Sequence, residues 1–227
     1  STTTIMFPHI SCFTALSSTR EIQQVSQLLE TIYGAVHKIA KHCGTFKVET
    51  IRHCNVAACR VHVAWNDHTE VAMARFARDC LFKMNELTRT MEVSLGPDTA
   101  DLGFRIGLHS GSVTGGVLRG DNARFQLFGD TMNTAARIET TGAPNRVHLS
   151  QATADLLVVA GKGHWVDPRT QTVTAKGKGQ LQTFWLRLAA VNTKLVLHSY
   201  AMTVCYKLED FHSADDTQHL LRRNTHD

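Results

Sequence analysis

Two polar side chains of complementary chemistry stand four positions apart in the middle of the sequence. Asn133 and Arg137 follow Asp130, an acid that can cap the start of a helix. Residues four apart lie on one face of a helix, so the amide and the guanidinium would project together. A neutral amide beside a permanent cation can hold a ribose and a developing phosphoryl charge. The segment therefore predicts a site for phosphate-containing chemistry.

Further motifs accompany this segment, which reads Gly-Asp-Thr-Met-Asn-Thr-Ala-Ala-Arg over residues 129–137. An Arg-x-Gly-x-His-x-Gly run occupies 105–111, Ala-Lys-Gly-Lys-Gly occupies 175–179, and Thr-Phe-Trp occupies 183–185. With these motifs, residues 2–188 resemble the catalytic domain of class III nucleotidyl cyclases, the adenylate and guanylate cyclase family. The resemblance implies conversion of ATP or GTP to a 3′,5′-cyclic nucleotide. It also implies a ferredoxin-like α+β sandwich, an α/β fold whose antiparallel sheet carries helices on one face.

The resemblance assigns roles to individual residues. In this family two catalytic domains pair head to tail, and each nucleotide site lies at the seam between them. By analogy Asn133 would orient the ribose, and Arg137 would neutralise charge on the α-phosphate as the 3′-oxygen attacks. Lys176 would hold the terminal phosphates as a point charge. The partner would be a second copy of this chain, or a different cyclase domain with an intact metal site.

Base selection would fall to Glu49 and Gln126, at the positions where family members read the purine. A carboxylate accepts hydrogen bonds from the N1–H and the exocyclic amine of guanine, whereas adenine presents an acceptor at N1. Gln126 can donate to guanine O6, although its amide can also turn to suit adenine. The pair predicts GTP as the substrate, with ATP as the second choice.

Two positions depart from the family pattern. His9 and His53 stand where the family carries the aspartates that bind two Mg²⁺ or Mn²⁺ ions. Mg²⁺ prefers oxygen ligands, so neutral imidazole is a poor substitute. Arg52 adds a cation beside the second position, and Pro8 removes a strand N–H beside the first. Imidazole suits Zn²⁺, Co²⁺ or Ni²⁺ better, which leaves a transition-metal site as a second interpretation.

Three hypotheses about function follow. The first is a guanylate-cyclase-type domain that forms cyclic GMP and pyrophosphate as the metal-deficient half of a dimer, and that is a pseudoenzyme alone. The second is a non-catalytic module that binds nucleotide or dimerises to regulate a larger signalling protein. The third is an active homodimer that uses its histidines with Mn²⁺ or another softer metal. The third is the weakest mechanism because both metal carboxylates are missing.

Composition sets bounds on the wider class of protein. The chain has 227 residues and a formal net charge of +4, which suits an anionic ligand but is too small and dispersed to indicate nucleic acid. Its six cysteines form no C-x-x-C pair, so we expect buried, reduced thiols. No apolar run approaches the roughly 20 residues that span a bilayer, and no signal peptide opens the chain. We expect a cytoplasmic protein, or the cytosolic domain of a larger membrane-anchored one.

Apolar periodicity and turn residues place the motifs on elements. Strands are expected over 2–10, 46–51, 55–64, 102–109, 112–118, 146–149, 165–166 and 183–188, with a hinge at residues 110–111. Helices are expected over 19–42, over 67–90, from Asp130 onward, and from a Ser150 cap to 157. The initial order β-α-β-β-α-β is that of a ferredoxin-like sandwich. Residues 1–190 would form the cyclase-type domain, and residues 191–227 a partly disordered C-terminal extension.

Overall fold

Two long strands form the centre of the fold. In the computed structural model, β1 (Thr2–Ser11) and β4 (Gly103–Ser112) pair antiparallel along their full length. Most residues of both strands are buried, as expected for central strands that are covered on both faces. The structure describes residues 2–43, 45–51, 55–59, 69–118, 124–175 and 179–187, which lie in one compact unit, Ser1–Arg187. The predicted extension over 191–227 lies outside the described residues.

A seven-stranded sheet surrounds this pair, in the order β2-β3-β1-β4-β7-β11-β8. The other strands are β2 (Phe46–Ile51), β3 (Asn55–Cys59), β7 (Arg146–Ser150), β8 (Val166–Pro168) and β11 (Thr183–Leu186). The antiparallel β2-β3-β1-β4 group has the ferredoxin-like order, so the predicted fold class is confirmed. Strand β7 runs parallel to β4, because a helix between them carries the chain back along the sheet. The complete sheet is therefore mixed rather than wholly antiparallel.

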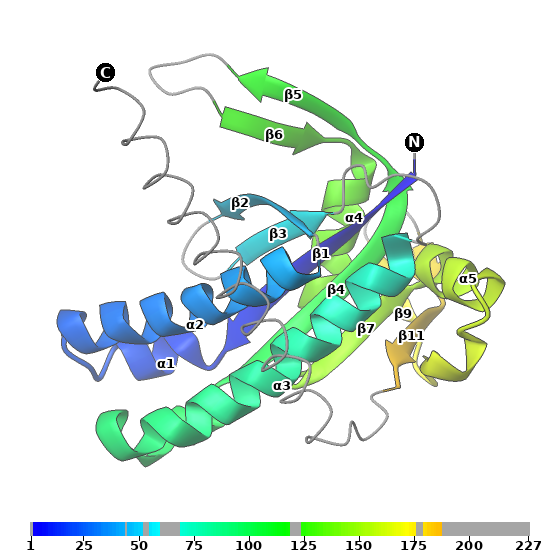
Figure 1. The fold of residues 1–227 in the computed structure, drawn as a ribbon. Coiled ribbons are helices and arrows are strands. Elements are labelled where there is room, and N and C mark those ends of the chain that lie inside the picture. Colours follow the sequence, from blue (N-terminus) through cyan, green and yellow to red (C-terminus); the bar gives the residue numbers. More distant parts are fainter. Residues whose placement is uncertain are drawn as a thin grey trace, which may run out of the picture. The chain divides into compact units, whose positions relative to one another are not determined.

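Helices cover both faces of this sheet (Figure 1). The long helices α2 (Ile22–His42) and α3 (Thr69–Leu95) pack against each other on one face, where α3 contacts β1 and β4. Helix α4 (Asp130–Thr140) packs against the same two strands from the other face. The prediction that the helices lie on one face of the sheet thus holds for α2 and α3, whereas α4 lies on the opposite face. Because α2 and α3 occupy one face, α4, which connects β4 to β7, packs on the other face.

A separate two-stranded ribbon, β5 (Thr114–Leu118) with β6 (Arg124–Phe128), follows β4. The predicted hinge at residues 110–111 is wrong, because β4 runs unbroken through both residues and β5 pairs with β6 instead. A second ribbon joins β9 (Val173–Ala175) to β10 (Gly179–Leu181). The remaining short elements are α1 (Phe13–Ser17), η2 (Pro97–Asp101), α5 (Gln151–Val159) and η3 (Gly163–Trp165).

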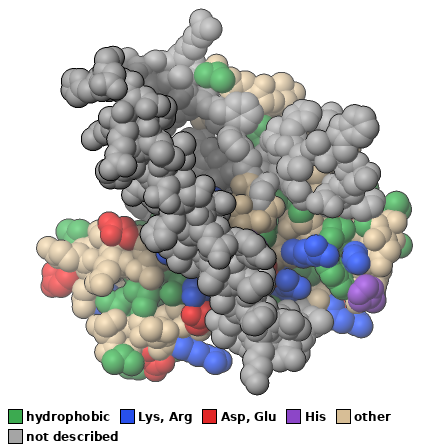
Figure 2. Space-filling view, in the orientation of Figure 1, with side chains coloured by type: hydrophobic (Ala, Val, Ile, Leu, Met, Phe, Trp, Pro, Cys, Tyr) green, Lys and Arg blue, Asp and Glu red, His purple; other side chains and the backbone are tan. Residues whose placement is uncertain are grey.

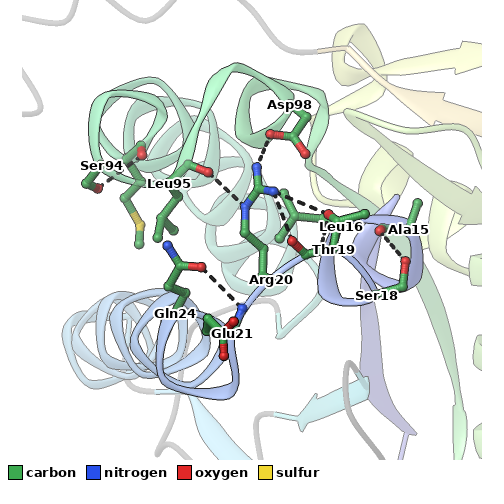
Figure 3. A network of polar contacts seen from close by, with 11 residues as sticks. Ala15, Leu16, Ser18, Thr19, Arg20, Glu21, Gln24, Ser94, Leu95 and Asp98 are labelled. Atoms are coloured by element: carbon green, nitrogen blue, oxygen red, sulfur yellow. Dashed lines mark hydrogen bonds and ion pairs between the residues drawn. The ribbon is translucent and has the colours of Figure 1, made fainter.

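The helix predicted over 19–42 begins at Ile22, because the residues before it form a turn that Arg20 holds. Figure 3 shows the Arg20 guanidinium at the centre of this turn. Its Nε donates to the carbonyl of Leu95 at 2.9 Å, and its Nη2 forms an ion pair with Asp98. Because Leu95 ends α3 and Asp98 lies in η2, one side chain fixes the start of α2 against the end of α3.

Charged side chains are unevenly spread over the face of the molecule drawn in Figure 2. Lys, Arg and His side chains gather on the right, on the side that carries α5, and the acidic side chains lie on the left, on the side of α2 and of the C-terminal end of α3. The charges of Lys162 and Arg75 lie 5.5 and 6.0 Å from the centre of the Trp165 ring. Lys162 and Trp165 lie at η3 and Arg75 lies in α3. The predicted site residues Asn133 and Arg137 lie on α4. The net charge of +4 therefore does not by itself locate the site.

Helix α4 lies close to β4 because glycines line the strand beneath it. Gly103, Gly107 and Gly111 follow one another at intervals of four and so share one face of the strand. A Cβ atom at Gly107 would lie 2.3 Å from the backbone nitrogen of Glu139, and one at Gly111 would lie 2.6 Å from Thr131 Oγ1. Because Thr131 and Glu139 stand near opposite ends of α4, the helix rests on strand backbone along its length.

Replacing Gly107 by alanine tests this packing. The new methyl group would force α4 away from the strand, so we expect the free energy of unfolding to fall by more than about 3 kcal/mol. Gly34→Ala is the matched control, because Gly34 lies inside α2 and a Cβ there would meet nothing within 4 Å. That change should stabilise the protein by about 1 kcal/mol. Urea unfolding followed by circular dichroism measures both; a Gly107→Ala protein as stable as the parent would contradict the close approach.

Candidate functional site

The site predicted around Asn133 and Arg137 is built on α4. Gly129 precedes the helix with a φ of 132°, a conformation that L side chains rarely adopt. Asp130 is the first helical residue and not the cap that the sequence predicted, because the chain enters the helix through the glycine. The Asp130 carboxylate accepts a hydrogen bond from the Thr134 hydroxyl at 3.4 Å. Its negative charge in the first turn still favours the helix dipole.

Asn133 and Arg137 share one side of α4, as predicted. The buried residues of the helix face the sheet and are Thr131, Thr134, Ala135, Ile138 and Glu139. Asn133 is exposed and Arg137 is half-buried. The Thr131 hydroxyl also donates to the carbonyl of Ser112 at 2.6 Å, which ties the first turn to the end of β4. The structure thus presents the amide and the guanidinium from a firmly seated helix, while their chemical roles remain predictions.

The strands that carry the predicted base-reading residues contact each other. Glu49 lies on β2 and Gln126 on β6, and these strands meet although they belong to different sheets. Gln126 is half-buried. Its neighbour Leu127 packs against an apolar cluster of β1 and α4 that includes Phe7, which attaches the ribbon to the site helix. The register of β2 with β3 shifts between Lys47 and Glu49, a β-bulge that no sequence signal indicated.

His9 lies near the end of β1. Among the described residues, β3 pairs with β1 at Ile5 and Met6, so Pro8 and His9 lie beyond that ladder. The ladder with β4 continues through Pro8 without a register shift, although proline has no N–H to give. Pro8 is buried and His9 is half-buried.

The residue opposite His9 on β4 is Arg105, so both side chains lie on the face that α4 covers. Arg105 Nε donates to Oε1 of Glu139 at 2.6 Å, and Glu139 is almost completely buried. A buried carboxylate requires a partner of this kind. The ion pair joins α4 to β4 beside His9. Glu139 is the one buried carboxylate of α4, and the Arg105 guanidinium binds it.

The described residues do not fit a Mg²⁺ site at His9. In the part of the chain that the structure describes, no group of three or more His, Cys, Asp or Glu side chains could hold a metal ion. His9 can offer one imidazole nitrogen, whereas Mg²⁺ prefers several oxygen ligands. The same finding gives a transition-metal centre no support within the described residues. His53 and Lys176 lie outside them, so the roles predicted for both remain predictions.

Two supporting interactions have no counterpart in the sequence predictions. One is the ion pair between Arg105 and Glu139. Its only signal in the sequence is that these two residues are oppositely charged and lie in motifs made largely of apolar or small residues. The other joins His109 Nδ1 to the hydroxyl of Ser150 at 2.8 Å. Ser150 also accepts from the backbone N–H of Thr153 at 3.3 Å, which confirms its predicted role as the cap of α5. His109 thus joins β4 to the cap residue of α5.

The ferredoxin-like core and a glycine-seated helix bearing Asn and Arg together define a nucleotidyl cyclase catalytic domain. Residues 1–188 match the family model for the adenylate and guanylate cyclase catalytic domain. The chain belongs to this family, as its sequence motifs predicted. Members of the family generally use Mg²⁺ or Mn²⁺. None of the described helices is long and apolar enough to cross a membrane.

Several known proteins that are similar to this chain are guanylate cyclases. Retinal guanylyl cyclase 2 of Bos taurus is 36% identical over 183 residues, which are 81% of this chain and 16% of that protein. Receptor-type guanylate cyclase gcy-28 of Caenorhabditis elegans is 36% identical over 184 residues, 81% of this chain and 14% of that protein. The guanylate cyclase domain of RhGC from Catenaria anguillulae, solved in complex with GTP, has a TM-score of 0.68 and 31% identity, covering 82% of this chain and 95% of that one. The chain thus spans about a sixth of the length of these curated relatives.

Removing Arg105 tests whether its ion pair holds α4 on the sheet. Arg105→Met leaves the Glu139 carboxylate buried without a partner, so the free energy of unfolding at pH 7 should fall by about 3–5 kcal/mol. Adding Glu139→Gln should recover part of that loss, because no buried charge remains. Arg187→Met, which breaks the exposed pair with Asp167, is the control and should cost less than about 1 kcal/mol. Chemical unfolding of the single and double variants gives the coupling free energy between positions 105 and 139. If the losses in unfolding free energy at these two positions simply add, this account is wrong.

Proposed function

We propose that this chain is a guanylate-cyclase-type domain that takes part in converting GTP to 3′,5′-cyclic GMP and pyrophosphate. In this proposal it acts in cyclic nucleotide signalling as the metal-deficient half of a dimer. The observation that carries the proposal is the shared face of Asn133 and Arg137 on a helix seated on the backbone of β4. Membership of the cyclase family supports the class of reaction.

The chemistry of each residue suits one part of the nucleotide. The 3′-oxygen attacks the α-phosphorus, and the bond from that phosphorus to the bridging oxygen of pyrophosphate breaks. Asn133 would hold the ribose so that its 3′-oxygen points at the phosphorus. Arg137 would bind the α-phosphate oxygens, where negative charge builds in the transition state. Lys176 would hold the terminal phosphates and stabilise the leaving pyrophosphate.

The choice of GTP rests on Glu49 and Gln126. Their strands, β2 and β6, are in contact, which supports a shared role in reading one purine. A carboxylate at 49 favours the donor edge of guanine over the acceptor at adenine N1. Similar proteins that bear the name guanylate cyclase support this choice. ATP is the second choice, because the amide of Gln126 can turn.

The metal-deficient half is inferred from His9 and His53. The imidazole of His9 stands opposite Arg105, whose guanidinium already engages the buried carboxylate of Glu139. A partner domain with both carboxylates would supply the Mg²⁺ or Mn²⁺, while this chain would supply Asn133 and Arg137 across the seam. In a homodimer, both clefts would lack the carboxylates. Each 1.36 kcal/mol of lost transition-state stabilisation lowers the rate about tenfold, so a homodimer would be nearly inactive.

Cellular location follows from the relatives by inference. The relative named a receptor-type guanylate cyclase is far longer than this chain, which spans 14% of it. We propose that this domain works in the cytoplasm, either alone or as the cytosolic domain of a larger membrane-anchored protein.

A non-catalytic module is the second candidate function. The observation in its favour is His9, which lies beside the Arg105–Glu139 ion pair where a metal carboxylate would stand in the family. Such a module would bind nucleotide, or dimerise, to regulate a larger signalling protein. It would keep the fold and the α4 face without any turnover.

A rescue assay distinguishes the two functions. The purified chain would be mixed with a guanylate cyclase domain that keeps both metal aspartates but lacks its own Asn and Arg on the corresponding helix. We expect cyclic GMP from GTP with Mg²⁺ or Mn²⁺ in the mixture, far less product from ATP, and almost none from either protein alone. Arg137→Ala in this chain should lower the rescued turnover by about 10²–10³-fold. Product is measured by chromatography.

Arg89→Ala is the matched control, because Arg89 is an exposed arginine of α3 on the other face of the sheet. Its rescued turnover should match that of the parent. Rescue that Arg137→Ala leaves intact would refute the role of Arg137. If no product forms although the two domains associate, the non-catalytic module becomes the better description.

Restoring the two family aspartates in this chain is a second test of the proposed nucleotide cleft. The double variant His9→Asp with His53→Asp should form cyclic GMP without a partner, because each cleft of its homodimer would regain both metal carboxylates. The His9→Asp single variant is the control and should stay at least about tenfold less active. A folded, dimeric double variant that remains inert would show that Asn133 and Arg137 are not catalytic in this chain.

A further inference from the structure

A buried histidine holds the last turn of α4. His148 lies on β7 with 0% of its surface exposed. Its Nδ1 is 2.6 Å from the carbonyl oxygen of Ile138, and its Nε2 is 3.4 Å from Nη1 of Arg169. A carbonyl can only accept and a guanidinium can only donate, so Nδ1 carries the proton and Nε2 is an acceptor. The ring is therefore neutral, with its tautomer fixed by its two partners.

Arg169 reaches the same turn of α4 directly. Its Nη1 donates to the carbonyl oxygen of Thr141 at 2.7 Å, and its guanidinium lies 5.0 Å from the centre of the Trp185 ring on β11. The His148 ring lies 4.8 Å from the same indole. Two side chains seated against one tryptophan thus donate to two carbonyls at the C-terminal end of α4. A cation placed there also complements the negative end of the helix dipole.

Arg137 belongs to this turn. Its own carbonyl accepts hydrogen bonds from the backbone N–H of Thr141 at 3.1 Å and from the Thr141 hydroxyl at 2.8 Å. Arg169 binds the carbonyl oxygen of the same residue, Thr141, and Ile138, the acceptor of His148, directly follows Arg137. Movement of either clamp partner would therefore shift the backbone from which the Arg137 side chain projects.

We propose that His148 and Arg169 are positioning residues for Arg137, which clamp the last turn of α4 to the outer strands of the sheet and so set where the guanidinium meets the α-phosphate. The proposal rests on the proposed function of Arg137. It gives β7, β8 and β11, which carry no predicted site residue, a part in the chemistry of the site.

The clamp works only with a neutral His148. A proton on Nε2 would remove the acceptor for Arg169 and set two cations side by side. Burial lowers the pKa of His148 from its ordinary 6.5 to about 4; the hydrogen bond to Ile138 opposes this shift, and the charges of Arg169 and Arg146 add to it. The Arg105–Glu139 pair completes the charged surroundings, since Arg105 and His148 both approach Gly142. The stability that the neutral ring contributes is therefore complete above pH 6.5 and is lost as the pH falls toward 4.

Hydrogen exchange tests the clamp without any assay of function. Arg169→Leu should speed exchange of the Thr141 and Gly142 amides at least about tenfold, because the last turn opens more often. Arg146→Leu is the matched control: Arg146 also stacks on Trp185, at 4.1 Å, but it is exposed on β7. It should change these rates less than about twofold. Equal acceleration in both variants, or none in Arg169→Leu, would overturn the clamp.

Nitrogen-15 NMR of labelled histidine tests the tautomer and charge of His148. At pH 7 the ring should carry its proton on Nδ1, and it should remain neutral at pH 5, where an ordinary histidine is charged. Arg169→Leu should raise the pKa of His148, because a neighbouring cation is removed. A ring that is protonated at pH 5 in the folded parent, or that carries its proton on Nε2, would overturn the assignment.

The rescue assay then tests the link to Arg137. Arg169→Leu should lower kcat about tenfold with KM changed less than about twofold, because binding is kept while orientation is lost. His148→Asn, whose amide can still donate to Ile138, should retain more turnover than His148→Leu. Faster exchange with unchanged kcat would refute positioning of Arg137. If the parent mixture makes no product, the proposed function fails, while the exchange and NMR results still decide whether the clamp exists.

Discussion

The backbone-level approach of α4 to β4 sets the geometry of the candidate site. Glycines at 107 and 111 remove side chains from beneath the helix, so its height above the sheet is fixed by main-chain contact. That contact brings Glu139 within reach of Arg105, so packing and electrostatics act together. A helix resting on a layer of flexible side chains could not hold its polar residues within the narrow limits that phosphoryl chemistry requires.

The two ends of α4 are attached to different parts of the sheet. The first turn is tied to the end of β4 through Thr131, and the last turn to the outer strands through His148 and Arg169. The strands that extend the ferredoxin-like core therefore act as support for one helix. The proposed chemistry depends on Asn133 and Arg137, which both lie on this doubly attached helix.

Local signals in the sequence were sufficient for α4 and for the cap at Ser150, because helix periodicity and capping involve residues within a few positions. They failed wherever the partner is distant. Gly111 looked like a hinge, since a glycine in a strand can mean a bend or a close contact, and only the helix above it decides. The Arg20–Asp98 pair spans 78 positions, and the surroundings of His9 are defined by its register with β4. Pairing between strands and the choice of sheet face are tertiary properties that no short window contains.

Pro8 has a consequence for the energetics of β1. Among the described residues, the ladder of β3 with β1 covers Ile5 and Met6, and Pro8 is buried beyond it. A buried backbone N–H without a partner would lower the free energy of unfolding. Proline has no N–H, so this position can lie outside the ladder without that cost. The residue that departs from the family pattern beside His9 can thus leave no unmatched donor in the interior of the sheet.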